Sequence, residues 1–308
     1  KEVHYWVGTP LPAGEVSARL RAPVARAPRT EIDQTTWATP DAAADMLTRR
    51  GDRRLLADLV ARAIEGRLIT STIIVLRPGP ADAPEDTSAS APAQRTTLDV
   101  PTPPKSRLAP TPAIVASAAA RRAAQVERAS SLTAEAAAHP ADPPLGRFGV
   151  RQSFDLIDLL SAFGVGRAFT SPSARARQVL APWAAVGGGS VTLVEALGVP
   201  VGDEAGADKD ADAQAGRVRA FAAQRLREQA GATLLSVTGA ARDLIVEEIR
   251  AYGSSAIVGA SPVSLGHGQI MVAHVEQGTD GPVVVAVETH SVTTKNPAVP
   301  TRRASRRH

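Results

Sequence analysis

The most distinctive charged residues of this 308-residue sequence lie at its C-terminal end. Residues 295–308, KNPAVPTRRASRRH, contain no acidic side chain, and their cations are Lys295, Arg302, Arg303, Arg306 and Arg307. The net charge of the whole chain is +4, less than that of this tail, so the remainder is close to neutral. Arginines without aromatic neighbours neutralise phosphates but do not stack on bases. The tail is therefore predicted to contact RNA or an acidic partner, with a plain solvated end as the alternative.

A second group of residues has the types needed for nucleophilic catalysis. The stretch GASPVSLGHG contains Ser261 and His267. A nucleophile elbow requires Gly-x-Ser-x-Gly at a strand–turn–helix junction. Here Pro262 stands where the helix should begin, Val263 replaces the second glycine, and no orienting acid can be identified. A loop is the favoured interpretation, and a catalytic site around Ser261 and His267 is kept as the alternative.

Phosphate loops and metal sites are not indicated. The glycines of GVG at 164–166 and GGG at 187–189 are not followed by the Lys-Ser/Thr of a phosphate-binding loop. They are predicted to end a helix and to form a flexible joint. The chain has no cysteine, its six histidines are scattered, and the acidic GDEAGADKDAD lacks the ligand spacing of a calcium loop. We therefore expect no catalytic residue, no metal ligand and no cofactor.

Periodicity divides the chain into four segments. Residues 1–78 are predicted to form a small α+β unit with helices in ATPDAAADMLTRRG and DRRLLADLVARAIEGR and a buried strand in LITSTIIVL. Residues 79–111, rich in Pro, Ala and Ser, are predicted to be an extended linker or arm. Residues 112–294 are predicted to form a helix-rich α+β domain, and 295–308 the basic tail.

Within 112–294 the pattern favours helices over strands. Helices are expected at 112–138, 153–164, 171–180, 190–197, 213–230 and 240–252. AIVGA is expected to be a strand, and QIMVAHVEQ and GPVVVAVETHSV, separated by a Gly-containing loop, are expected to be an antiparallel hairpin. The predicted fold class is α+β, helix-rich, with a C-terminal hairpin or small sheet and a long Pro/Ala/Ser-rich extended connection.

Composition also suggests partners and location. Aromatic residues make up 3% of a chain that is 44% hydrophobic, so an Ala-rich core gains little per residue and favours self-association or packing against other subunits. No apolar run reaches the length of a membrane span, and the N-terminal residues lack a leader's apolar region. A non-secreted protein without a membrane span is expected.

The stretches PADAPEDTSASAPAQ and TPPKSRLAPTPAIVASAAARRAA, together with TRRASRRH, resemble in composition the Pro/Ala/Ser-rich structural proteins of fungal double-stranded RNA viruses. The resemblance implies a non-enzymatic coat or capsid-associated protein, located in the virion or the host cytoplasm. Two alternatives remain open. One is an α/β-type enzyme of a GC-rich bacterium with its site near Ser261 and His267. The other is an adaptor of a phage-tail or secretion machine.

Overall fold

The computed structural model describes residues 30–81, 142–198, 207–228, 231–260 and 264–292, together with a few isolated positions before residue 30. The predicted linker at 79–111 and the predicted helix at 112–138 lie almost wholly outside these ranges, as does the basic tail.

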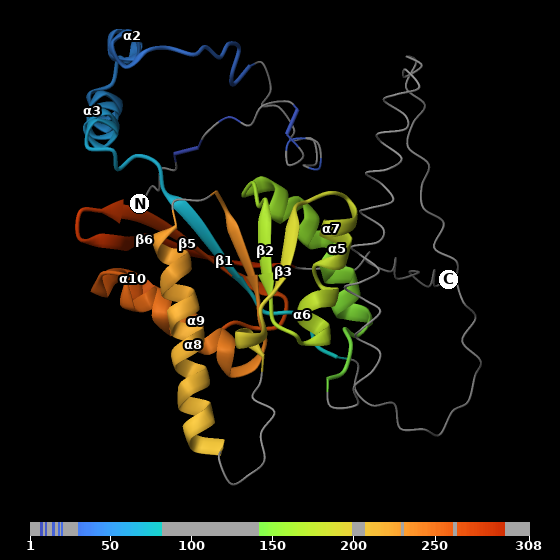
Figure 1. Cartoon of the computed structure of the whole chain (residues 1–308). Coiled ribbons are helices and arrows are strands. Elements are labelled where there is room, and N and C mark those ends of the chain that lie inside the picture. The colour runs from blue at the N-terminus through green and yellow to red at the C-terminus, as the bar shows by residue number, and fades with distance from the viewer. Residues whose placement is uncertain are drawn as a thin grey trace, which may run out of the picture.

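A six-stranded sheet organises the described residues, with the strand order β3-β2-β4-β1-β5-β6 (Figure 1). Its strands are β1 (Ser71–Leu76), β2 (Arg167–Thr170), β3 (Ser190–Leu193), β4 (Thr233–Ser236), β5 (Gln269–Gly278) and β6 (Gly281–Ser291). The first four in this numbering run parallel to one another, whereas β5 is antiparallel to β1 and β6 is antiparallel to β5. The fold is therefore mixed α/β, because four of the six strands of this one sheet run parallel to one another.

Helices cover both faces of this sheet (Figure 1). On one face, α8 (Ala207–Arg227) and α9 (Gly239–Ala251) pack on Ile73, Val75 and Leu235. On the other face, α5 (Arg147–Ala162) and α7 (Ala181–Ala185) pack on Ile74, Leu76 and Leu234. The alternation of side chains along β1 and β4 thus feeds two separate apolar clusters.

The remaining elements are short or peripheral. They are α2 (Pro40–Met46), α3 (Arg50–Ile64), α6 (Ala174–Gln178), the 3-10 turn η2 (Glu195–Leu197) and α10 (Ser255–Ala260). Neither α2 nor α3 contains a buried residue, although both lie where the sequence predicts helices. The Pro at the start of α2 and Thr39, whose hydroxyl accepts from the Ala42 amide, explain where that helix begins.

Several sequence expectations need correction. The predicted helix at 190–197 is strand β3 followed by η2, and the predicted strand AIVGA is helix α10. Two strands, β2 and β4, had not been expected at all. The predicted hairpin is present as β5 and β6. It is not a separate small sheet, because β5 pairs with β1 and continues the parallel strands.

Candidate anion-binding site

Three parallel strands end at the same edge of the sheet. Leu76 at the end of β1 and Thr170 at the end of β2 both pair in register with Ser236 at the end of β4. In open sheets of this kind, ligands bind outside the carboxyl ends of the strands. The residues that follow β1, β2 and β4 are therefore the first place to look for chemistry.

An arginine follows each of these three strands. Arg77 comes directly after β1, Arg175 lies in α6 after β2, and Arg242 lies in the first turns of α9 after β4. Partial burial, followed by the positive charges of Arg242 and Arg175, lowers the pKa of Arg77 from its usual value, and the carboxylate of Asp243 raises it. The charges of Arg175 and Arg242 therefore both act on Arg77. We call Arg77, Arg175 and Arg242 the arginine site.

The guanidinium of Arg77 is held by the turn that precedes β5. Its Nη1 donates to the carbonyl oxygen of Leu265 at 2.5 Å, and its Nη2 lies 2.9 Å from Nε2 of His267. Arginine has no acceptor, so Nε2 of His267 must accept this hydrogen bond. Nδ1 of the same ring then carries the hydrogen and donates to the carbonyl oxygen of Pro78 at 3.1 Å.

Arg175 and Arg242 differ in how their charges are satisfied. Arg242 is buried and donates to both carboxylate oxygens of Asp243, at 2.6 and 2.8 Å from its Nη2. Nε of Arg175 is buried and has no hydrogen-bond partner within the part of the chain that the structure describes. Of the two, Arg175 therefore has the clearer capacity to bind an additional acceptor.

The segment that carries Arg175 is fixed to the neighbouring strand. The amide of Ser171 donates to the carbonyl of Ser236 at 3.1 Å, and the hydroxyl of Ser236 donates to the carbonyl of Ala176 at 2.8 Å. The carboxylate of Asp142 accepts from the amide of Ala174 at 2.5 Å and from the hydroxyl of Ser173 at 3.2 Å. These bonds hold α6 in place, so that Arg175 is presented on a rigid turn.

Helix α9 contributes its N-terminus to the same edge. It begins with Gly239, whose φ of +60° allows the chain to turn sharply out of β4, and Thr238 makes no side-chain hydrogen bond to the helix. The first amides of a helix and its dipole favour negative charge. This field adds to that of the three arginines, and the carboxylate of Asp243, in the first turns of the same helix, already binds Arg242.

The candidate residues of the sequence lie elsewhere, with one exception. The tail cations Lys295, Arg302, Arg303, Arg306 and Arg307, and also Ser261, lie outside the described residues. His267 is exposed and contacts Arg77, so it belongs to the edge of the arginine site. The site arginines themselves were missed. Arg77 could have been recognised in the sequence, because it comes directly after the buried run STIIVL.

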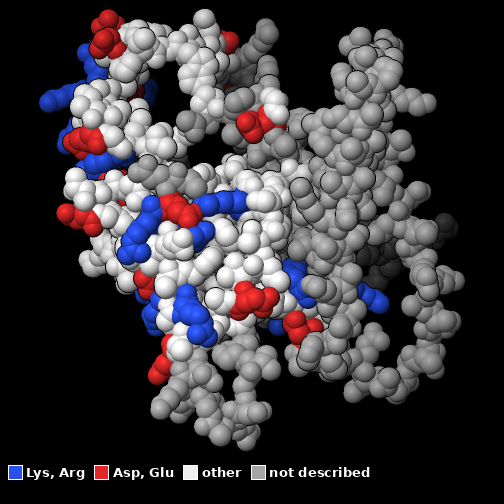
Figure 2. All heavy atoms as spheres, viewed as in Figure 1, with Lys and Arg blue, Asp and Glu red and all other residues white. Residues whose placement is uncertain are grey.

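Other arginines are paired with acidic or aromatic groups. Arg219 binds Glu247 at 3.0 Å, and Arg225 binds Glu228 at 2.6 Å. Figure 2 shows basic and acidic side chains interspersed over the face in view. Over the described residues, that face offers no continuous basic field of the kind a nucleic-acid surface requires.

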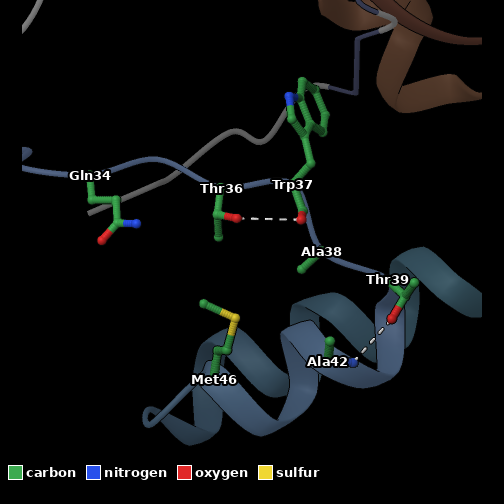
Figure 3. A pocket seen from close by; sticks show the side chains of 7 residues that line it. All are labelled: Gln34, Thr36, Trp37, Ala38, Thr39, Ala42 and Met46. Atoms are coloured by element: carbon green, nitrogen blue, oxygen red, sulfur yellow. Dashed lines mark hydrogen bonds between the residues drawn. The ribbon is translucent and has the colours of Figure 1, made fainter.

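A hollow at the other end of the described chain has little chemical content. It is lined by Gln34, Thr36, Trp37, Ala38, Thr39, Ala42 and Met46 (Figure 3). Trp37 is 89% exposed, and none of the lining side chains is charged. The hollow has no group that would transfer a proton or bind an ion, so the arginine site is the stronger candidate.

The sequence predicts neither a metal site nor a membrane span, and the described residues can be compared with both expectations. There, no three His, Cys, Asp or Glu side chains are grouped closely enough to hold a metal ion. In the same residues, no helix is both long and apolar enough to cross a membrane. Self-association, expected from the Ala-rich composition, stays a prediction.

No family model matches the chain, and no curated protein matches it either. Solved structures similar to it include a protein histidine phosphatase, SixA, complexed with tungstate, at 16% identity over 72% of this chain and 97% of that chain, with a TM-score of 0.37. Another is phosphoserine phosphatase from Entamoeba histolytica, at 13% identity over 73% and 98%, with a TM-score of 0.36. A third is a mycobacterial glucosyl-3-phosphoglycerate phosphatase, at 12% identity over 72% and 97%, with a TM-score of 0.40.

These matches correct the functional expectation. The sequence led us to expect a non-enzymatic coat or capsid-associated protein of a virion, with RNA-binding activity, and that expectation is wrong, since the similar structures are phosphatases. At such low identity and TM-scores the likeness assigns no role to any residue of this chain. The resemblance to fungal virus proteins rested on composition, which the matches do not test.

Proposed function

We propose that the chain binds a phosphate monoester at the arginine site and acts on it in a phosphoryl-transfer reaction, with water as the acceptor. The observation that carries the proposal is the grouping of Arg77, Arg175 and Arg242 behind three parallel strands. Arg77 is partly buried and lies near the positive charges of Arg242 and Arg175, and an anion bound beside it would offset this unfavourable environment.

A phosphate ester fits this arrangement better than a carboxylate. Guanidinium groups bind phosphate oxygens through paired N–H donors, and a phosphate dianion offers three such oxygens to separate arginines. In phosphoryl transfer the developing charge lies on these oxygens, so fixed cations lower the barrier without any covalent role. The arginine site would supply this electrostatic stabilisation.

The first test of the proposal is binding. Calorimetric titration of the intact chain with orthophosphate should show one binding site in wild type. Arg175→Ala should lower the affinity for orthophosphate by about tenfold or more. The matched control is Arg219→Ala, which removes an arginine from an exposed pair with Glu247. Equal affinities in wild type and Arg175→Ala would reject the arginine site as the place of binding.

The second test is turnover. The chain should hydrolyse p-nitrophenyl phosphate, and Arg175→Ala should lower kcat/KM by about 100-fold, a loss on the scale of removing one charge-stabilising donor. Arg219→Ala should leave kcat/KM unchanged. Phosphate binding without turnover in wild type would reject the reaction.

A further inference from the structure

The position of Arg77 depends on a short turn far away in the sequence. Residues 264–268 lead into β5, which lies beside β1 in the sheet (Figure 1). Leu265 and His267 of this turn accept hydrogen bonds from two nitrogens of the Arg77 guanidinium, at 2.5 and 2.9 Å. The turn thereby holds two of the three nitrogens of the guanidinium.

The turn is itself fixed to the backbone of Arg77. The amide of Gly268 donates to the carbonyl of Arg77 at 2.9 Å, and the amide of Arg77 donates to the carbonyl of Gln269 at 3.0 Å. The side-chain oxygen of Gln269 accepts from the amide of Gly266 at 2.6 Å. Backbone and side chain of Arg77 are therefore both held by this turn, through Leu265, His267 and Gly268, and by the first residue of β5.

From this geometry we infer that His267 is a positioning residue that holds the guanidinium of Arg77 in the orientation that binds the anion. The inference rests on the proposed phosphate site. His267 acts through Arg77 and makes no bond to the phosphoryl group. What it must supply is an acceptor at Nε2, and the donor at Nδ1 serves to fix the ring on the carbonyl of Pro78.

The two ring nitrogens can be replaced one at a time. The amide oxygen of glutamine reaches the place of Nε2, so His267→Gln keeps an acceptor for Arg77. The shorter asparagine reaches only the place of Nδ1, so His267→Asn keeps the bond to Pro78 but leaves Arg77 without its acceptor. The two variants are of similar polarity, and they differ in the one contact that the inference requires.

The experiment measures orthophosphate affinity by calorimetry in the full chain. His267→Ala and His267→Asn are expected to weaken binding by about fivefold to tenfold, the effect of one lost charge-assisted hydrogen bond. His267→Gln is expected to stay within about twofold of wild type. Because His267 is exposed, thermal unfolding of all three variants should match wild type, which separates positioning from stability. Equal loss in the Gln and Ala variants would overturn the inference.

A double-mutant cycle with Arg77→Ala gives the decisive readout. If His267 works through Arg77, adding His267→Ala to Arg77→Ala should cost no further affinity. A full additional loss in that background would show that His267 contacts the anion directly and would overturn positioning. If Arg77→Ala and Arg175→Ala both bind phosphate as wild type does, the proposed site itself fails. If those two lose binding but His267→Ala does not, only the positioning inference fails.

Discussion

Gly268 and Gly66 share one backbone conformation but differ in their surroundings. Their φ values are +71° and +70°, a region that glycine adopts freely and other residues adopt at a cost. A Cβ at Gly66 would meet nothing within 4 Å, whereas a Cβ at Gly268 would lie 2.1 Å from the side-chain nitrogen of Gln152. Gln152 is 3% exposed and donates to the carbonyl of Val292, so it has little room to move.

This pair of glycines allows backbone strain to be separated from collision. Gly66→Ala should lower the free energy of unfolding by about 1 kcal/mol, the cost of a left-handed alanine. Gly268→Ala should lower it by about 3 kcal/mol, since overpacking adds to the same strain. Urea unfolding of both variants measures the difference. Phosphate titration of Gly268→Ala should also show weaker binding, because the turn that holds Arg77 is displaced. Equal losses of stability at the two positions would contradict the collision.

At the scale of elements, Arg225 joins α8 to the sheet at the edge opposite the arginine site. Its guanidinium lies 4.9 Å from the ring centre of Phe169 on β2 and 5.0 Å from that of Phe221 on α8. It also binds Glu228 at 2.6 Å, and its side chain is only 10% exposed. Arg225 is therefore a packing residue of the helix–sheet contact.

Arg225→Ala should lower the free energy of unfolding by about 2 kcal/mol, because two cation–π contacts are lost and Glu228 keeps fewer partners. Arg219→Ala on the same helix is the control, and it should change stability by less than about 0.5 kcal/mol, since its pair with Glu247 is exposed. Thermal unfolding followed by circular dichroism checks both. A loss at Arg225 no larger than that at Arg219 would rule out the packing role.

Across the whole molecule, β1 joins segments that the sequence had placed in different units. It belongs to the predicted unit 1–78, yet it pairs with β4 and β5 of the predicted domain 112–294. Ile73 faces the cluster under α8 and α9, and Ile74 faces the cluster under α5 and α7. Both are almost fully buried, at 2% and 0% exposure. The division into separate domains remains a prediction, and β1 provides its test.

If the two clusters unfold as one unit, Ile73→Ala and Ile74→Ala should each shift a single transition. Each variant should lose about 2–5 kcal/mol, the range for emptying a buried isoleucine site. The readouts are far-ultraviolet circular dichroism and near-ultraviolet signals from Trp183, which is buried in the second cluster. Coincident transitions are expected in both variants. If Ile73→Ala left the Trp183 transition in place while the helical signal moved, the clusters would be independent.

Hydrophobic periodicity in the sequence was enough to predict the helices and strands that are long enough to show it. Helices at Arg50–Ile64, Arg147–Ala162 and Gly239–Ala251 have apolar stripes of three turns or more, and each overlaps a predicted helix, although the second begins six residues earlier than expected. The hairpin of β5 and β6 was predicted because both strands are long and are joined by a Gly-containing turn. Strands β2 and β4 have four residues each, which is too short for an alternation of apolar and polar residues to be recognised in the sequence.

The sequence by itself determined the long helices, the hairpin and the buried strand 71–76, because local hydrophobic spacing dictates which face each of them buries. Only the tertiary structure decided that AIVGA is a helix, that β2 and β4 exist, and that β1 lies between β4 and β5. Short segments take their conformation from the partners they pack against. The arginine site was decided in the same way. Arg175 and Arg242 are far from Arg77 in the chain, and they come near it because three parallel strands end at one edge of the sheet.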